Sequence, residues 1–159
     1  MKALIVYDSF FGNTQKIAEA IGKSMNANET VPVIKVADVK PQDLLHLDYL
    51  IVGSPTRAFQ PTPAITKLIK RIPSDGLIGT KVAAFDTRIA VDEISVAILK
   101  FGAKLFGYAA KPIANFLEKK RGTLAVPPEG FFVKESEGPL KEGELERAAA
   151  WAKQILNLK

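Results

Sequence analysis

Residues 8–14, with the sequence DSFFGNT, carry the groups that a protein needs to hold a phosphate. Ser9 and Thr14 offer hydroxyl donors, and Asn13 offers a side-chain amide. Gly12 lets the backbone approach a ligand closely, and a helix that begins here presents unpaired N–H groups. A Walker lysine and the pattern G-x-G-x-x-G are both missing, so neither a nucleoside triphosphate nor a dinucleotide is predicted. An ordinary helix cap is the alternative.

Residues 53–59, with the sequence GSPTRAF, suit an aromatic ring beside that phosphate. Pro55 stiffens the chain, Thr56 offers a hydroxyl, and Phe59 offers an aromatic face that can cover a ring. A plain strand-to-helix turn, in which Phe59 packs against one of the prolines that follow it, is the alternative.

Residues 85–88, which follow the fourth predicted strand, add charged and hydroxyl groups. They come from Asp86, Thr87 and Arg88. A purely structural alternative stays open, in which Asp86 caps the next helix or pairs with Arg88.

Alternating strand and helix patterns place these three stretches at one edge of a sheet. Apolar, β-branched runs predict five strands, over residues 3–7, 31–36, 48–52, 81–85 and 123–126. Apolar residues at helical spacing predict helices over residues 17–25, 64–72, 94–105, 112–122 and 143–156. In the last helix the predicted buried face is formed by Leu145, Ala149, Ala152 and Leu156. Repeated strand–helix units build parallel sheets, so the three stretches gather where the strands end.

The proline at position 32 selects one of the two strand orders that such chains commonly adopt. Pro32 has no N–H group, so it is tolerated mainly in an edge strand. The second strand lies at the edge in the order 2-1-3-4-5, whereas it is interior in the order 3-2-1-4-5. We therefore predict an α/β fold, in which residues 1–159 form a single domain. Its core is a three-layer, doubly wound, five-stranded parallel sheet of order 2-1-3-4-5.

Residues 8–14 resemble the FMN phosphate loop of flavodoxins, whose usual form is Ser/Thr-x-Thr/Ser-Gly-x-Thr. The resemblance is closest to the flavodoxin domains of flavodiiron proteins, where an aromatic residue often precedes the glycine. Phe11 takes the place of the usual third hydroxyl. The resemblance implies that the FMN phosphate is surrounded by Ser9, Phe10, Phe11, Gly12, Asn13 and Thr14.

Residues 53–59 resemble the second flavin loop of the same family. This implies that the ribityl chain and the isoalloxazine ring are flanked by Ser54, Pro55, Thr56, Arg57, Ala58 and Phe59. Residues 85–88 lie where the third flavin loop lies, but they lack its usual glycine and aromatic residue. The flavin-binding candidates there are Asp86, Thr87 and Arg88.

The composition excludes several classes of site. The absence of cysteine rules out disulfides, thiolate metal sites, iron–sulfur clusters and cysteine nucleophiles, and the single histidine rules out any site that needs two. We predict no metal site and no catalytic residue. No apolar run approaches the ~20 residues that cross a bilayer. We therefore expect no membrane segment and, by default, a cytoplasmic location.

The resemblance implies an FMN-binding electron carrier, and the net charge of +5 favours acidic redox partner proteins. Because the basic residues are scattered, nucleic-acid binding is not favoured. Arg57 and Arg88 near the flavin predict a midpoint potential less negative than is usual for flavodoxins, because cations stabilise the reduced anion. Two alternatives stay open. One is an NAD(P)H-dependent flavin or quinone reductase, which has a similar Pro55-Thr56-Arg57 loop and forms homo-oligomers; the other is a flavin-free binding or regulatory protein.

Overall fold

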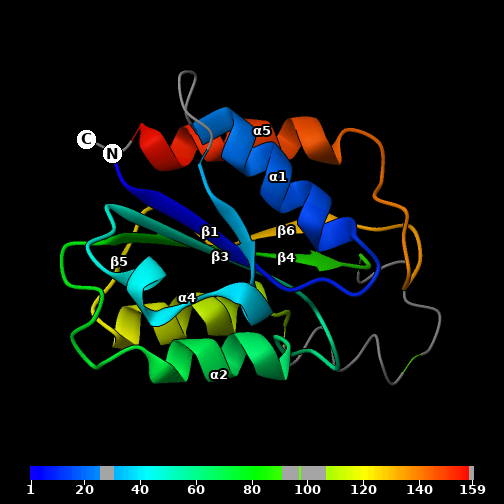
Figure 1. Cartoon of the computed structure of the whole chain (residues 1–159). Coiled ribbons are helices and arrows are strands. Elements are labelled where there is room, and N and C mark those ends of the chain that lie inside the picture. Colours follow the sequence, from blue (N-terminus) through cyan, green and yellow to red (C-terminus); the bar gives the residue numbers. More distant parts are fainter. Residues whose placement is uncertain (26–30, 91–96, 98–106, 158–159) are drawn as a thin grey trace.

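The computed structural model has parallel strands stacked between two pairs of helices (Figure 1). It describes residues 1–25, 31–90, 97 and 107–157. The predicted helix over residues 94–105 lies almost wholly outside them. The described chain runs in order through β1 (Ala3–Tyr7), α1 (Asn13–Met25), β2 (Val33–Lys35), the 3-10 helices η1 (Val36–Asp38) and η2 (Pro41–Leu44), β3 (Tyr49–Pro55), α2 (Pro63–Arg71), β4 (Lys81–Arg88), α4 (Ala110–Lys119), β5 (Thr123–Leu124), β6 (Glu129–Phe132) and α5 (Glu144–Leu156).

The strand order in the sheet is β2-β1-β3-β4-β5, and neighbouring strands are parallel. The predicted fold class and strand order are therefore confirmed. Among the described strands, β2 pairs with β1 alone. Pro32 directly precedes β2, and its carbonyl accepts a hydrogen bond from the Ile5 amide at 2.9 Å. The proline thus lies at the sheet edge, where its missing N–H group leaves no ladder partner unsatisfied.

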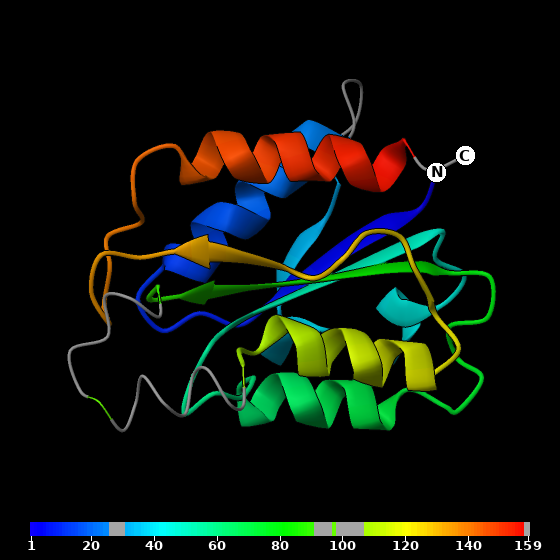
Figure 2. The same ribbon diagram turned by 180° about the vertical axis from the view of Figure 1, so that it is seen from behind.

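Each helical layer buries one face of the sheet. α1 and α5 cover one face, and α2 and α4 cover the other (Figures 1 and 2). The buried side chains of the first layer include Ile17, Ile21, Ala148, Trp151 and Ile155. Those of the second layer include Ile65, Ile69, Ile113 and Leu117. Because both faces are covered, β1, β3 and β4 are buried almost throughout, which explains their continuous apolar runs.

β3 and β4 extend further than their sequence patterns predicted. The strand predicted over residues 48–52 is Tyr49–Pro55, and the one predicted over residues 81–85 is Lys81–Arg88. Parallel pairing continues through Gly53↔Phe85, Ser54↔Asp86 and Pro55↔Thr87. The predicted ends were wrong because polar side chains were taken to mark loops, whereas the ladder uses backbone groups. Residues 53–55 and 86–88 are therefore strand ends.

The fifth strand position is filled by two short strands, one of which the sequence pattern missed. The predicted strand over residues 123–126 is shorter in the structure, because β5 ends at Leu124. Pro127 and Pro128 follow, and neither can donate to the ladder. The chain then returns to β4 as β6, with the register Phe85↔Glu129 to Arg88↔Phe132. β6 therefore completes the sheet beside the end of β4 (Figure 2).

α5 buries a different face from the predicted one. Ala148, Trp151, Ala152 and Ile155 are buried, whereas Leu145, which was predicted to point inward, is 43% exposed. Of the four residues predicted for the buried face, Ala152 alone is fully buried. The reason lies in the first residue of the helix, because the Glu144 carboxylate is buried.

A carboxylate–guanidinium cluster holds α5 in this orientation and joins it to β6. Glu144 accepts hydrogen bonds from Arg147 Nη2 at 2.7 Å, from Arg147 Nε at 3.0 Å and from the Phe132 amide at 2.6 Å. Arg147 also donates to the Gly130 carbonyl and lies 3.1 Å from Glu129 Oε1. Burial alone would raise the pKa of Glu144, but the hydrogen bonds from Arg147 and Phe132 outweigh it and hold the pKa below its ordinary value.

We expect Glu144→Gln to destabilise the protein in a pH-dependent way. A carboxyl whose pKa is lowered by folding stabilises the fold above its unfolded-state pKa of about 4.3, and this stability is lost as the pH falls through the folded-state value. At about pH 7 the variant should lose about 1–3 kcal/mol of unfolding free energy, as for a hydrogen bond to a charged group. Urea unfolding at about pH 7 and about pH 3.5 should show that the loss shrinks in acid.

Glu146→Gln, on the exposed side of the same helical turn, is the control for this experiment. Its unfolding free energy should differ from that of the wild type by less than about 0.5 kcal/mol at both pH values. An equal loss for Glu144→Gln at neutral and acid pH would contradict a role for its charge.

Candidate functional site

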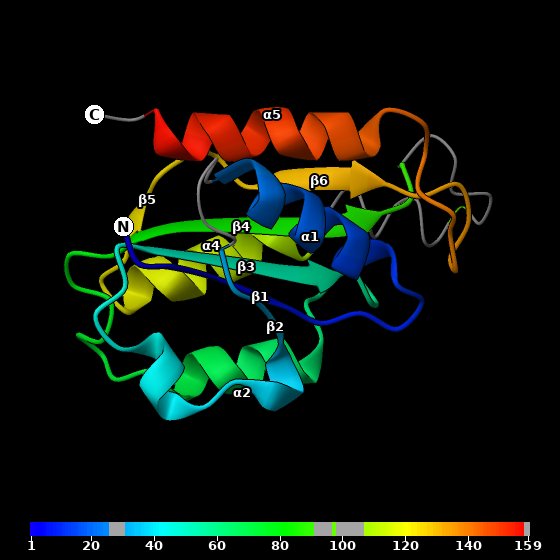
Figure 3. The same ribbon diagram turned by 45° about the horizontal axis from the view of Figure 1, so that its top comes forward.

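The carboxyl ends of β3 and β4, together with residues that follow β1, β3 and β4, meet in one cleft of about 120 Å³. It lies at the carboxyl ends of the strands, toward which the arrows in Figure 3 point. All three predicted stretches contribute lining residues, which are Ser9, Phe10, Phe11, Asn13, Thr14, Pro55, Thr56, Arg57, Thr87 and Arg88. α1 follows β1 on one face of the sheet, and α2 follows β3 on the other. Open α/β sheets bind ligands at such a switch point.

The first turn of α1, directly after the first loop, has backbone N–H groups without acceptors in the helix. Gly12 adopts φ +86°, and its amide donates to Ser9 Oγ at 3.0 Å. The first hydrogen bond of the helix runs from the Lys16 amide to the Gly12 carbonyl at 3.1 Å. The amides of Asn13, Thr14 and residue 15 precede that bond, so the helix offers them no acceptor. Free amides and the positive end of the helix dipole suit an anion.

Two aromatic side chains project from the tip of this loop. Phe10 is 56% exposed and Phe11 is 49% exposed, which is unusual for residues of this size. The Arg57 guanidinium, from the second loop, lies 5.0 Å from the centre of the Phe10 ring. This cation–π contact joins the first two loops at the mouth of the cleft. The mouth therefore offers flat, apolar faces next to a positive charge.

Side-chain contacts fix the inner end of the first loop. Thr14 is buried, and its Oγ1 lies at hydrogen-bond distance, 2.8 Å, from Thr87 Oγ1 at the end of β4. The Asn13 side-chain amide donates to the Glu137 carbonyl at 3.0 Å. The start of α1 is thus tied both to the sheet and to the segment before α5.

The second loop uses two of its hydroxyls to hold its own shape. Ser54 is fully buried, and its Oγ donates to the Pro55 carbonyl at 2.8 Å and accepts from the Thr62 amide at 3.0 Å. Thr56 Oγ1 accepts from the Ala109 amide at 3.1 Å. Three predicted residues of this loop, namely Ser54, Ala58 and Phe59, are not among the residues that line the cleft.

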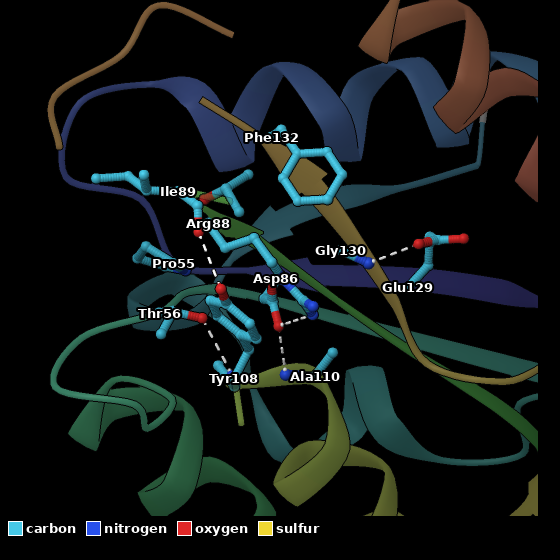
Figure 4. A network of polar contacts seen from close by, with 12 residues as sticks. Pro55, Thr56, Asp86, Arg88, Ile89, Tyr108, Ala110, Glu129, Gly130 and Phe132 are labelled. Carbon is cyan, nitrogen blue, oxygen red and sulfur yellow. Dashed lines mark hydrogen bonds and ion pairs between the residues drawn. The ribbon is translucent and has the colours of Figure 1, made fainter. Parts of the chain in front are cut away.

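The third stretch contains a buried ion pair (Figure 4). Asp86 is fully buried and accepts from Arg88 Nε at 2.5 Å, from Arg88 Nη2 at 2.6 Å and from the Ala110 amide at 2.8 Å. The structural alternative in which Asp86 pairs with Arg88 is therefore confirmed. Asp86 also caps α4, whereas the helix predicted to follow it directly, over residues 94–105, lies outside the described residues. Complete burial raises the pKa of the Asp86 carboxyl, and the hydrogen bonds from Arg88 and Ala110 oppose that rise. The Arg88 guanidinium also lies 4.0 Å from the centre of the Tyr108 ring.

Three further lining residues were not predicted, namely Ile89, Val133 and Ser136. Val133 and Ser136 follow β6, and they were missed because the fifth strand was predicted to end at residue 126. The available signal was the pair of phenylalanines at 131 and 132, followed by the turn residues Gly138 and Pro139.

The charges of the cleft come from two arginines with different surroundings. Arg88 is neutralised by Asp86, whereas Arg57 has no carboxylate partner among the described residues.

In the part of the chain that the structure describes, no group of three or more acidic or histidine side chains is placed to hold a metal ion. None of the described helices has the length and apolar character needed to cross a membrane.

A family model for the flavodoxin domain matches residues 4–95, more than half of the chain. This chain belongs to the flavodoxin family. The matched segment begins within β1 and continues past β4, so it contains all three stretches that line the cleft.

Individual flavodoxins and related proteins agree with this assignment. A flavodoxin of Aquifex aeolicus is 29% identical over 132 residues, which are 75% of this chain and 69% of that protein. An uncharacterised protein of Methanocaldococcus jannaschii is 28% identical over 113 residues, 65% of this chain, and the match spans 29% of that protein's length. The solved structure of a flavodoxin from the domain Archaea has a TM-score of 0.73 at 24% identity, covering 98% of this chain and 96% of that one. The structural likeness shows a shared fold.

We expect Asp86→Asn to cost about 3 kcal/mol of unfolding free energy, because it breaks a buried ion pair and leaves Arg88 without a matching charge. Asp75→Asn is the matched control. Asp75 pairs with Arg121 at 3.6 Å, but both side chains are more than 60% exposed, at 68% and 65%. That control should lose less than about 1 kcal/mol. Urea unfolding of both variants measures the difference, and equal losses would contradict a structural role for the buried pair.

Proposed function

We propose that this flavodoxin-family protein binds FMN in the cleft and transfers electrons through it. The observation that carries the proposal is the convergence of two loops and the end of β4 on a single cleft, with helix amides at one end and aromatic faces at the other. FMN needs both kinds of surface, because it joins a phosphate to an apolar ring system. The family of the chain supports the same ligand class.

The phosphate belongs at the start of α1 in this proposal. There the amides of Asn13 and Thr14 precede the first helical hydrogen bond, and Gly12 keeps the backbone open to close approach. Ser9 Oγ accepts from Gly12 and keeps its own hydrogen to donate. The isoalloxazine ring belongs near Phe10 and Arg57, with Phe11, Pro55, Thr56, Thr87 and Arg88 as further contacts. The remaining predicted residues, namely Ser54, Ala58, Phe59 and Asp86, shape the loops behind these contacts.

An electron carrier fits the residues of the cleft better than an enzyme with a substrate of its own. The charged residues that line the described cleft are Arg57 and Arg88, and no carboxylate or histidine lines it. Acid–base and nucleophilic chemistry depend on such groups. FMN supplies the redox chemistry when bound, and the protein sets its potential and its access to partners.

The positive charge of the chain favours acidic redox partners. The net charge is +5, and Arg57 stands exposed at the cleft mouth. A partner that approaches the flavin there meets a cation, so opposite charge speeds encounter and salt weakens association.

Flavin binding itself is tested by adding FMN to the purified protein, desalting it and recording an absorbance spectrum. We expect flavin bands to survive desalting, and we expect slow reduction by NAD(P)H without an added reductase. Rapid, steady NAD(P)H oxidation with a quinone would instead identify the chain as a reductase. A colourless protein that leaves FMN fluorescence unquenched would refute the proposal.

We expect Arg57→Ala to make the midpoint potential of bound FMN more negative, on the order of 20–60 mV at low salt. The physical reason is that a nearby cation stabilises the reduced, anionic flavin, and removing it takes that stabilisation away. A spectroelectrochemical titration of both proteins measures the shift.

Arg71→Ala is the control for the potential, because Arg71 is the last residue of α2 and is not among the residues that line the cleft. It removes the same charge without changing the cleft, so its potential should equal that of the wild type. A shift of equal size in both variants would assign the effect to net charge rather than to Arg57.

A further inference from the structure

The segment between β6 and α5 forms a fourth wall of the cleft. It folds back on itself through backbone hydrogen bonds from Lys134 to Pro139, from Gly138 to Glu135 and from residue 141 to Phe132, each of 2.9 Å. An antiparallel bridge between residues 133 and 140 closes it. Its own hydrogen bonds therefore define the shape of this segment, residues 133–140.

One side chain fastens this fourth wall to the phosphate end of the cleft. The Asn13 amide donates to the Glu137 carbonyl at 3.0 Å, across 124 positions of sequence. Gly138 adopts φ +105°, and a Cβ atom there would lie only 2.6 Å from Asn13 Oδ1. The glycine thus lets the two backbones approach each other. Residue 136, next to the fastened carbonyl, is held beside the start of α1.

The hydroxyl groups that line the cleft differ in their protein partners, and those of Ser9 and Thr56, which only accept, keep a hydrogen to donate. Among the hydroxyls that line the cleft, those of Thr14 and Thr87 bond each other, that of Thr56 accepts from residue 109, and that of Ser9 accepts from Gly12. Ser136 is exposed, lines the same cleft, and has no side-chain hydrogen-bond partner among the residues that the structure describes, so its hydroxyl is open to a ligand that enters the cleft. The tip of the first loop contributes no further donor side chain, because Phe10 and Phe11 occupy it.

We propose that Ser136 donates a hydrogen bond to the phosphate of FMN, and that Asn13 acts as the positioning residue that holds Ser136 there. This inference rests on the proposed FMN binding and adds a specificity-determining residue from a fourth segment. Glu135 and Glu137 flank Ser136, but both are exposed, so solvent screens their charge from the phosphate. The pair Ser136 and Asn13 then selects the phosphorylated flavin over riboflavin, which has the same ring without the phosphate.

The test compares the Kd values of FMN and riboflavin by fluorescence quenching. Ser136→Ala should raise the Kd of FMN roughly 10-fold or more, as for the loss of a hydrogen bond to a charged group. It should leave the Kd of riboflavin unchanged, because riboflavin has no group for Ser136 to contact. Ser74→Ala, an exposed loop serine after α2, is the matched control and should change neither value.

Asn13→Ala tests the positioning role separately. It keeps the backbone amide of residue 13 but removes the bond to Glu137, so it should weaken FMN binding about as much as Ser136→Ala. If Asn13 acts through Ser136, the double variant should bind FMN no more weakly than Asn13→Ala alone, a non-additivity that a double-mutant cycle measures. Thermal unfolding of each variant confirms that the compared proteins are folded.

The outcomes separate this inference from the proposed function. Equal changes in the Kd of FMN and riboflavin, or no change in either, would overturn the role of Ser136. Full additivity of the two substitutions would overturn the positioning role of Asn13. Wild-type protein that binds neither flavin would overturn the proposed function itself.

Discussion

The complete burial of one carboxylate, that of Asp86, governs how the chain is assembled around its cleft. A buried charge is costly unless other groups compensate it, so Asp86 requires donors from its surroundings. Arg88, two residues further along β4, and the first amide of α4 supply them. The Arg88 guanidinium then lies against the Tyr108 ring on one side and Gly130 of β6 on the other, where a Cβ atom would lie 2.1 Å from its Nε. One desolvated group thus fixes the relative positions of β4, α4 and β6.

This arrangement gives the two arginines of the cleft separate tasks. Arg88 has a structural role, because its charge is matched by Asp86 and the face of its guanidinium lies against the Tyr108 ring. Arg57 stands at the mouth, where only the Phe10 ring contacts its guanidinium among the interactions of the described residues. The local field at the mouth therefore depends on one exposed side chain. Its influence is sensitive to ionic strength, in contrast to that of the buried pair.

The sequence allowed the strand order and most of the cleft to be predicted, because both depend on local signals. Pro32 has a chemical property that only an edge position tolerates, and loops at strand ends converge in any parallel sheet. The errors arose where distant partners decide. Glu144 is buried because Arg147 and the Phe132 amide donate hydrogen bonds to it. This contact rotates α5 away from the face that its apolar residues predict. The bond from Asn13 to Glu137 joins segments whose closeness no local pattern reveals.

Both edges of the sheet are short, and this bears on how copies of the protein behave at high concentration. As far as the described residues extend, one edge is β2, with 3 residues after Pro32, and the other is divided between β5, with 2 residues, and β6, with 4. An exposed strand edge is a template on which another chain can add a strand. These edges offer few consecutive N–H and C=O groups, and a proline or a break interrupts each of them. Within the part of the chain that the structure describes, the short edges therefore shield the apolar central strands from edge-to-edge pairing.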